Sequence, residues 1–336
     1  MKKREIPFIE ASDTNYNAGY KIGQRCKSQI ERLIDVSKKK YSSITGRPFE
    51  YFIRRSRKLL ALCQKEYTHY INEIKGVTDG AGVSFDEYFA LNFEDEIADF
   101  TSKCTTFYLK IKDNVYLGHN EDWTDDFLDK LYILKLKQRD KPDVLFLSYL
   151  GPPQFIVASL NSAGIAFTGN SLYITHKLGI PEALMLRTMA DAKNVKEAVS
   201  DLMVKPREMG MNSMIVSRNK VVDVENSLNK SAVIEIKKDW FVHTNHPLKL
   251  KGEHYKNSLL RYNRVSEILE NTNDKNINLI KKILSDHRNF PDSICRHSKK
   301  DVKWATIASV IIDIKRMKML IAHGNPCKNG YRAYKL

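Results

Sequence analysis

The sequence changes its periodicity at residue 104, and this change limits the folds that the chain can form. Before it, residues 17–40 and 52–74 carry apolar side chains at helical spacing, and a third helix follows the capping box Ser84-x-x-Glu87. After it, short segments with the period of strands are interrupted by two pairs of helices. The helix pairs are expected at 181–191 with 195–203 and at 254–270 with 277–286. The strands are expected at 132–137, 144–150, 155–160, 164–169, 213–217, 221–226, 232–237, 240–244, 304–312 and 318–323.

This order of elements predicts an α+β fold in which two antiparallel sheets are stacked between helical layers. The sequence contains no internal repeat, low-complexity tract or flexible linker. We therefore expect residues 1–103 and 104–336 to form one integrated fold rather than two separate domains. The change at residue 104 then indicates a processing boundary inside that fold.

Cys104 opens a strand-turn-strand unit, KCTTFYLKIKDNVYLGHNEDW, over residues 103–123. Apolar and polar side chains alternate on the first strand, Asp113-Asn114 is expected to form the turn, and the return strand ends in a polar cluster that includes Asp122. In an antiparallel pair the end of the second strand lies beside the start of the first. The hairpin should therefore place Asp122 next to Cys104, which is the arrangement of a nucleophile and its orienting groups.

The charge and the cysteines limit the classes of partner. The chain has 55 Lys and Arg against 40 Asp and Glu, but these residues are scattered, which indicates a solvated basic surface. An anionic substrate or a membrane surface remains an alternative, and a nucleic acid is not expected. No apolar run reaches the length of about 18 residues that a membrane span needs. No apolar segment follows the basic residues of MKKREIPFIEAS, so we do not expect a secretory signal.

Five cysteines, an odd number without close metal-type pairs, favour a reducing compartment over a disulfide framework or a zinc site. No glycine-rich phosphate loop is present that would indicate a coenzyme A donor. We therefore expect a cytoplasmic protein with no cofactor and no metal. The oligomeric state is left open, and a homo-oligomer is compatible with the sequence.

Several ordered motifs resemble those of the penicillin acyltransferase family, peptidase C45-like N-terminal nucleophile hydrolases with choloylglycine hydrolases and penicillin V acylases as more distant relatives. A Cys-Thr pair opens a strand at Cys104, and a Gly-x-Asn-x-Asp cluster ends the next one at Asp122. The other matching segments are LNSAGIAFTGNSL (160–172), HTNHP (243–247), SICRH (293–297), TIASVIID (306–313) and AHGNPC (322–327). The resemblance implies the four-layer αββα sandwich of N-terminal nucleophile hydrolases.

The resemblance also implies that the precursor cleaves itself between Lys103 and Cys104. Residues 1–103 would be a pro-segment or α subunit, and residues 104–336 the catalytic β subunit. Cleavage would free an α-amine on Cys104, and such an amine has a pKa of about 7.7–8.0, which suits a general base near neutral pH. The chain departs from the family at Lys103, where glycine is usual.

By the same resemblance, Cys104 is the nucleophile, Asp122 holds its amine, and Asn245 and Asn170 form the oxyanion hole. Glu121 is expected on the opposite face of its strand, in a structural role. Either Thr306 or Ser309 would supply a pocket hydroxyl, because alternation places only one of them on a given face. The candidate substrate-binding residues are His119, Asn120, Arg296 and Thr306.

These features predict a self-processing cysteine amidohydrolase that cleaves a linear C–N amide through a thioester on Cys104. The substrate would be a small molecule: an N-acyl amino acid, a peptide-like amide or an acyl amine. Two alternatives remain. One is an acyltransferase that moves the acyl group to an amine. The other is an uncleaved, noncatalytic binding protein of the same fold, in which Lys103 blocks maturation.

Overall fold

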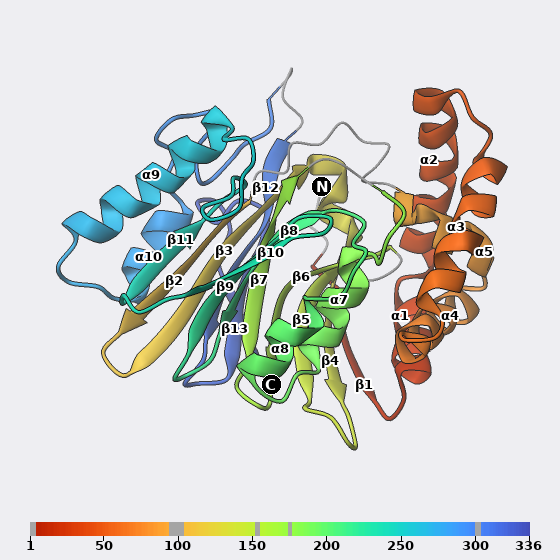
Figure 1. Cartoon of the computed structure of the whole chain (residues 1–336), viewed down its shortest axis with the longest axis horizontal. Helices are drawn as coiled ribbons and strands as arrows, with labels where there is room; N and C mark the ends of the chain where they lie inside the picture. The colour runs from red at the N-terminus through yellow and green to blue at the C-terminus, as the bar shows by residue number, and fades with distance from the viewer. Residues whose placement is uncertain (1–4, 94–103, 152–154, 174–176, 300–303) are drawn as a thin grey trace.

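The computed structural model describes residues 5–93, 104–151, 155–173, 177–299 and 304–336, which form two stacked sheets with helices outside them (Figure 1). The larger sheet has eight strands, in the order β1 (Phe8–Ser12), β4 (Leu131–Lys137), β5 (Val144–Tyr149), β6 (Ile156–Asn161), β7 (Ala166–Tyr173), β8 (Gly210–Val216), β9 (Val221–Asn226) and β10 (Ser231–Glu235). The smaller sheet has six, in the order β11 (Trp240–His243), β2 (Thr105–Ile111), β3 (Asn114–Thr124), β12 (Trp304–Asp313), β13 (Lys318–His323) and β14 (Arg332–Lys335).

Three cores define four layers. Successive residues of one strand enter different cores: Ile133 faces the smaller sheet, whereas Leu134 faces the helices outside the larger sheet. Those helices are α1 (Asn15–Arg25), α2 (Lys27–Thr45), α3 (Phe49–Cys63), α4 (Thr68–Ala81), α5 (Phe85–Phe89), α7 (Glu182–Ala190) and α8 (Val195–Asp201). The third core joins the smaller sheet to α9 (Lys256–Asn271) and α10 (Ile277–Leu284). The predicted αββα sandwich is confirmed, with α9 and α10 on one side and α1–α5 on the other (Figure 1).

Helices α1 and α4 pack with their backbones in contact. A Cβ atom added to Gly19 would lie 1.9 Å from the Glu73 carbonyl oxygen, and one added to Gly76 would lie 2.1 Å from the Tyr16 carbonyl oxygen. Only glycine permits this approach. The sequence spacing Gly19-x-x-x-Gly23 therefore serves helix packing.

The structure differs from the sequence prediction in several elements. The helix expected over residues 17–40 is broken at Cys26 into α1 and α2, and the helix expected over residues 52–74 is divided into α3 and α4. Strand β14, at the edge of the smaller sheet, is absent from the prediction. Strand β1 was not predicted, and it adds to the edge of the larger sheet parallel to β4, whereas the other strand pairs are antiparallel. The five residues of β1, FIEAS, are too few for the alternation of a strand to be recognised in the sequence.

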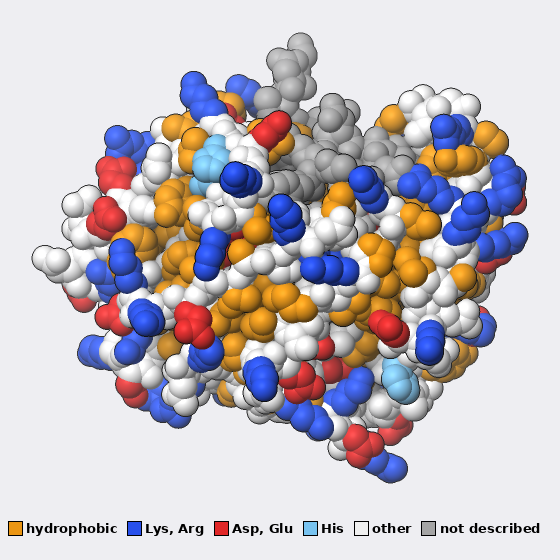
Figure 2. All heavy atoms as spheres, in the orientation of Figure 1, with side chains coloured by type: hydrophobic (Ala, Val, Ile, Leu, Met, Phe, Trp, Pro, Cys, Tyr) orange, Lys and Arg blue, Asp and Glu red, His pale blue; other side chains and the backbone are white. Residues whose placement is uncertain are grey.

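The surface in Figure 2 carries Lys and Arg side chains over many elements, with Asp and Glu between them. This face shows the scattered basic charge expected from the sequence. Within the described ranges, no helix has both the length and the apolar character needed to cross a membrane.

Candidate active site

Cys104 lies directly before β2, and its side chain is buried between the sheets. The register of β2 and β3 pairs Thr105 with Asn120 and Thr106 with His119, which brings the end of β3 beside Cys104. The backbone N–H of Asp122 donates to the Cys104 thiol. The hairpin therefore returns Asp122 to Cys104 as its period predicted, although the turn consists of Lys112 and Asp113, one residue earlier than expected.

His119 and Glu121 lie on the face of β3 that is directed at the larger sheet. The His119 ring is fully buried, with Nδ1 2.8 Å from the Thr106 hydroxyl and Nε2 2.8 Å from a Glu121 carboxylate oxygen. The Tyr149 hydroxyl donates to the other oxygen of Glu121 at 2.8 Å. Both ring nitrogens of His119 are therefore engaged within the protein, and the histidine orients Glu121.

Glu121 is not on the side of the strand that we expected. Its carboxylate, the His119 ring and the Cys104 sulfur lie within 4.8 Å of one another, and Glu121 lines the same pocket as Cys104. The prediction that Glu121 faces away from the site is wrong. Because Cys104 and Glu121 occupy the same face of the sheet, the alternation of β3 places Asp122 on the opposite face.

Asp122 is held by Thr306 on the neighbouring strand β12. The Thr306 hydroxyl donates to one Asp122 oxygen at 2.6 Å and accepts from the Arg296 backbone N–H at 2.9 Å. The Arg296 guanidinium is buried and donates to Asp292 at 3.1 Å. Thr306 therefore bonds Asp122, whereas Ser309 bonds the Tyr331 hydroxyl, and neither lines the pocket. The expected alternation does not hold, because the register shift between Thr306 and Ala308 pairs Thr306 with Asp122 and Ser309 with Asn120, on one face of the sheet.

Arg261 of α9 connects Cys104 to Asn245, and sequence reasoning missed it. One guanidinium nitrogen donates to the Cys104 carbonyl oxygen and, at 3.0 Å, to the Thr105 hydroxyl. The other donates to Asn245 Oδ1 at 2.9 Å, while Asn245 Nδ2 donates to the Ser171 carbonyl at 3.0 Å. A signal was present, because Arg261 falls on the buried stripe of α9, between Ser258 and Val265.

Asn170 belongs to a polar network between the two sheets. Its Oδ1 accepts from the Thr106 hydroxyl at 3.3 Å, and its Nδ2 donates to Asn212 Oδ1 at 2.8 Å. Asn212 in turn donates to Asp223. One amide hydrogen of Asn170 is therefore committed to this network, which limits what it can offer to a substrate.

Asn120 lies on the helix-facing side of β3, away from the pocket. Its Nδ2 donates to the carbonyl oxygens of Leu284 at 2.8 Å and Ile294 at 2.9 Å, and its side chain is fully buried. It anchors the segment after α10 to the sheet. Lys103, the other half of the expected cleavage site, lies outside the described residues.

Burial dominates the electrostatics of the site. Burial raises the pKa of the Cys104 thiol well above its usual range, and the charges of Glu121 and Asp122 raise it further. The Asp122 backbone N–H and the charge of Arg261 lower that pKa, but by less. Burial also raises the pKa of Asp122 to about 7, although Arg296, Arg261 and the Thr306 hydroxyl oppose that shift. The Cys104 thiol is therefore protonated at neutral pH and would need a base before it could act as a nucleophile.

A pocket of about 120 Å³ opens beside Cys104. Its lining is mainly apolar and includes the rings of Trp123, Phe127, Tyr149 and Phe155. Its lining also includes Glu121, whose carboxylate is bonded by His119 and Tyr149, and Glu182 and Glu208. The mainly apolar lining suits an uncharged group, and its aromatic rings can also accept a cation.

Cys104, His119 and Glu121 also have the donor types of a metal site. Both nitrogens of His119 already bond Thr106 and Glu121, however, so a metal would have to displace one of these bonds. A nucleophile with its supporting groups fits the contacts better.

The sequence profile of the family described as acyl-coenzyme A:6-aminopenicillanic acid acyl-transferase matches residues 109–328. This range is more than half of the chain, and the chain therefore belongs to that family. The resemblance inferred from the short motifs is confirmed. The matched range begins after Cys104, so the role of this cysteine rests on the geometry described above.

Among curated proteins, the chain is similar to the beta-alanyl-dopamine/carcinine hydrolase of Drosophila melanogaster, with 25% identity over 227 residues. The match covers 59% of this chain and 57% of the relative, little more than half of its length.

The chain is also similar to two solved structures. A mutant of conjugated bile acid hydrolase from Clostridium perfringens has a TM-score of 0.47 at 13% identity, covering 69% of this chain and 97% of that one. Penicillin V acylase from Agrobacterium tumefaciens has a TM-score of 0.45 at 16% identity, covering 66% and 82%. Both likenesses are distant.

Proposed function

We propose that this protein is a self-processing amidohydrolase that cleaves a linear C–N amide through a thioester on Cys104. The observation that carries the proposal is a buried oxygen of Asp122, the residue whose backbone N–H donates to the Cys104 thiol. Among the described residues, Asp122 Oδ2 has no hydrogen-bond partner, although its other oxygen is held by Thr306. A buried carboxylate oxygen without a donor is costly. A new α-amine on Cys104 would supply that donor.

Maturation would begin when the Cys104 sulfur attacks the carbonyl carbon of Lys103. The C–N bond between the two residues breaks as the C–S bond forms, and the Cys104 nitrogen takes up the thiol proton. Water then hydrolyses the thioester, leaving a carboxylate on Lys103 and a free α-amine on Cys104. The carbonyl oxygen of Cys104 is fixed by Arg261, which limits the motion of the residue that must react.

In the mature enzyme, the α-amine would take the proton of the Cys104 thiol as the sulfur attacks the substrate amide. Asp122 would orient the amine, and the Asn245 amide would stabilise the negative oxygen that develops. The amine product leaves with the proton, and water attacks the thioester with the same α-amine as base. Arg261 supports this arrangement because it fixes Asn245 Oδ1 and so the direction of its NH2 group.

An acyl amine is the substrate class that the pocket favours. The mainly apolar and aromatic lining accepts an apolar or cationic group, whereas a buried carboxylate would lose its hydration there. The Drosophila relative is named as a hydrolase of beta-alanyl-dopamine and carcinine, and a beta-alanyl group carries an amine that is positively charged at neutral pH. N-acyl amino acids and peptide-like amides remain candidates if their carboxylates stay outside the pocket.

Acyl transfer to an amine is the second candidate, because the family to which the chain belongs is described as an acyl-transferase. Hydrolysis is preferred here, since a transferase must exclude water from the thioester. We also propose a cytoplasmic location, which the five free cysteines support.

The test is the intact mass of freshly purified protein under denaturing conditions, measured beside Cys104→Ala. We expect two fragments that meet at Lys103 and Cys104 in the wild type and one full-length chain in the variant. The processed protein should then hydrolyse β-alanyl and propanoyl amides faster than the succinyl amide of the same amine, because only the succinyl group carries a negative charge. A single full-length mass in the wild type would leave Cys104 without an α-amine and would favour a noncatalytic binding protein.

A further inference from the structure

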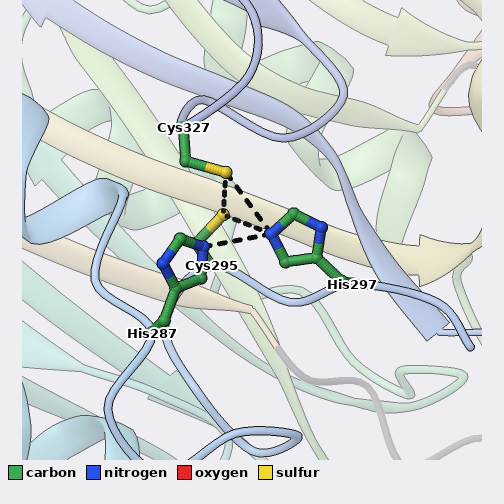
Figure 3. A group of neighbouring side chains, drawn as sticks. All are labelled: His287, Cys295, His297 and Cys327. Atoms are coloured by element: carbon green, nitrogen blue, oxygen red, sulfur yellow. Dashed lines mark hydrogen bonds between the residues drawn. The ribbon is translucent and has the colours of Figure 1, made fainter.

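Four side chains outside the active site converge on one point: His287, Cys295, His297 and Cys327 (Figure 3). They come from three segments: the turn after α10, the stretch that precedes β12, and the loop after β13. Their ligand atoms, two sulfurs and two Nε2 nitrogens, all lie within 4.8 Å of one another. No spacing in the sequence indicates this group, because only Cys295 and His297 are close in the chain.

Four of the six distances between these atoms are defined by the contacts among them, and each lies within about 0.4 Å of the edge of a tetrahedron around a metal. The two sulfurs are 3.6 Å apart. His297 Nε2 lies 3.7 Å from the Cys295 sulfur, 3.3 Å from the Cys327 sulfur and 3.0 Å from His287 Nε2. Zinc bonds of about 2.3 Å to sulfur and about 2.0–2.1 Å to nitrogen predict tetrahedral edges of about 3.8, 3.6 and 3.4 Å for S–S, S–N and N–N.

Hydrogen bonding alone does not explain the arrangement of His297. Its Nε2 has three neighbours, but a ring nitrogen offers either one proton or one lone pair. A cation at the centre would satisfy all four ligand atoms at once. Two thiolates and two imidazoles are also a donor set that zinc prefers in structural sites.

A supporting contact is present around the ligands. Asn325 Nδ2 lies 3.7 Å from the Cys295 sulfur and donates to the Arg296 carbonyl, so it bonds both a ligand and the residue next to it. Such outer contacts orient the ligands of metal sites. His287 and Cys327 are exposed, which gives an ion access from solvent.

We propose that His287, Cys295, His297 and Cys327 bind one zinc ion as a structural site. The ion would join the three segments that carry its ligands and limit their motion. It would also fix Arg296, which lies between two of the ligands and whose backbone N–H bonds Thr306, the partner of Asp122. Zinc binding itself does not depend on the proposed activity, so the two proposals can fail separately.

The experiment measures zinc per chain by elemental mass spectrometry in untagged, full-length protein. The test variants are Cys327→Ser and His287→Ala, because both side chains are exposed and their loss should leave the fold intact. One control is His69→Ala, an exposed histidine on α4. The other is Cys104→Ala, which removes a donor from the group formed with His119 and Glu121.

We expect about one zinc per chain in the wild type and both controls, and loss of zinc from both test variants. The loss of affinity should exceed the about 10–100-fold that changes in outer contacts cause. A chelator should lower the melting temperature of the wild type but not of the variants. Cobalt should replace zinc and give the absorption of a metal–thiolate bond.

Three results would overturn the proposal. The first is a wild type without metal in zinc-supplemented medium. The second is zinc that persists in both test variants, or that is lost in Cys104→Ala. The third is a mass lower by two hydrogens that a reductant restores, which would identify Cys295 and Cys327 as a disulfide-forming pair instead.

Discussion

Arg261 is the side chain that ties the nucleophile to the proposed oxyanion group. Its guanidinium spans Cys104, Thr105 and Asn245 from within the protein, and burial lowers its pKa to about 10, which leaves it charged at neutral pH. A planar fork can serve these acceptors simultaneously, whereas an ammonium group acts as a point charge. The orientation of the Asn245 amide is therefore set by Arg261 on α9.

At this scale we predict that Arg261→Lys lowers kcat by about 10²–10³, the typical value of one oxyanion donor, with little change in KM. The charge remains, but Asn245 loses its partner and its amide can rotate. Steady-state kinetics, normalised to the processed fraction by intact mass, would measure the effect. Arg57→Lys, an exposed pair with Asp86, is the control and should not alter kcat. An unchanged kcat in Arg261→Lys would remove the positioning role.

Helices α1 and α4 are held together by a contact that the glycines alone permit. Gly19 and Gly23 on one helix and Gly76 and Gly80 on the other each bring a backbone within reach of its neighbour. Alanine has the higher helix propensity, by about 1 kcal/mol. A methyl group at Gly76, however, would lie 2.1 Å from a carbonyl oxygen, and only separation of the helices could relieve that clash.

We therefore predict that Gly76→Ala destabilises the protein by about 1–3 kcal/mol, the usual cost of overpacking, despite the gain in propensity. Gly330→Ala is the matched control, since an added Cβ there meets nothing within 4 Å. It should change stability by no more than about 0.5 kcal/mol. The midpoint of denaturant unfolding would measure both. A stabilised Gly76→Ala would mean that the helices separate at little cost.

Residues 5–93 are joined to the rest of the molecule by a shared core and a buried ion pair. Helices α1–α5 pack with α7, α8 and the larger sheet in one cluster, and β1 is a strand of that sheet. Glu73 of α4 bonds the guanidinium of Arg187 on α7 at 3.1 Å, with both side chains buried. Removing one partner of a buried ion pair costs about 3–5 kcal/mol, so separation is strongly opposed.

At the scale of the molecule, cleavage after Lys103 should leave the two fragments associated. We predict one species of full-length mass by native mass spectrometry or gel filtration, from a sample that gives two fragments when denatured. Cys104→Ala, expected to remain one chain, marks the elution position. Loss of residues 1–103 under native conditions would identify them as a released pro-segment instead of a subunit.

Local patterns in the sequence determined most of the order of helices and strands and the return of the hairpin from Asp122 to Cys104. The reason is that the spacing of apolar residues and the register of a hairpin depend only on residues close together in the chain. They also led to the family to which the chain belongs. Only the tertiary structure showed which residues distant in sequence are in contact, such as Arg261 with Cys104. It also placed Glu121 in the pocket lining and added the parallel strand β1. It also decided the cluster of His287, Cys295, His297 and Cys327. Which distant side chains converge depends on how the layers pack, and no spacing along the chain encodes that packing.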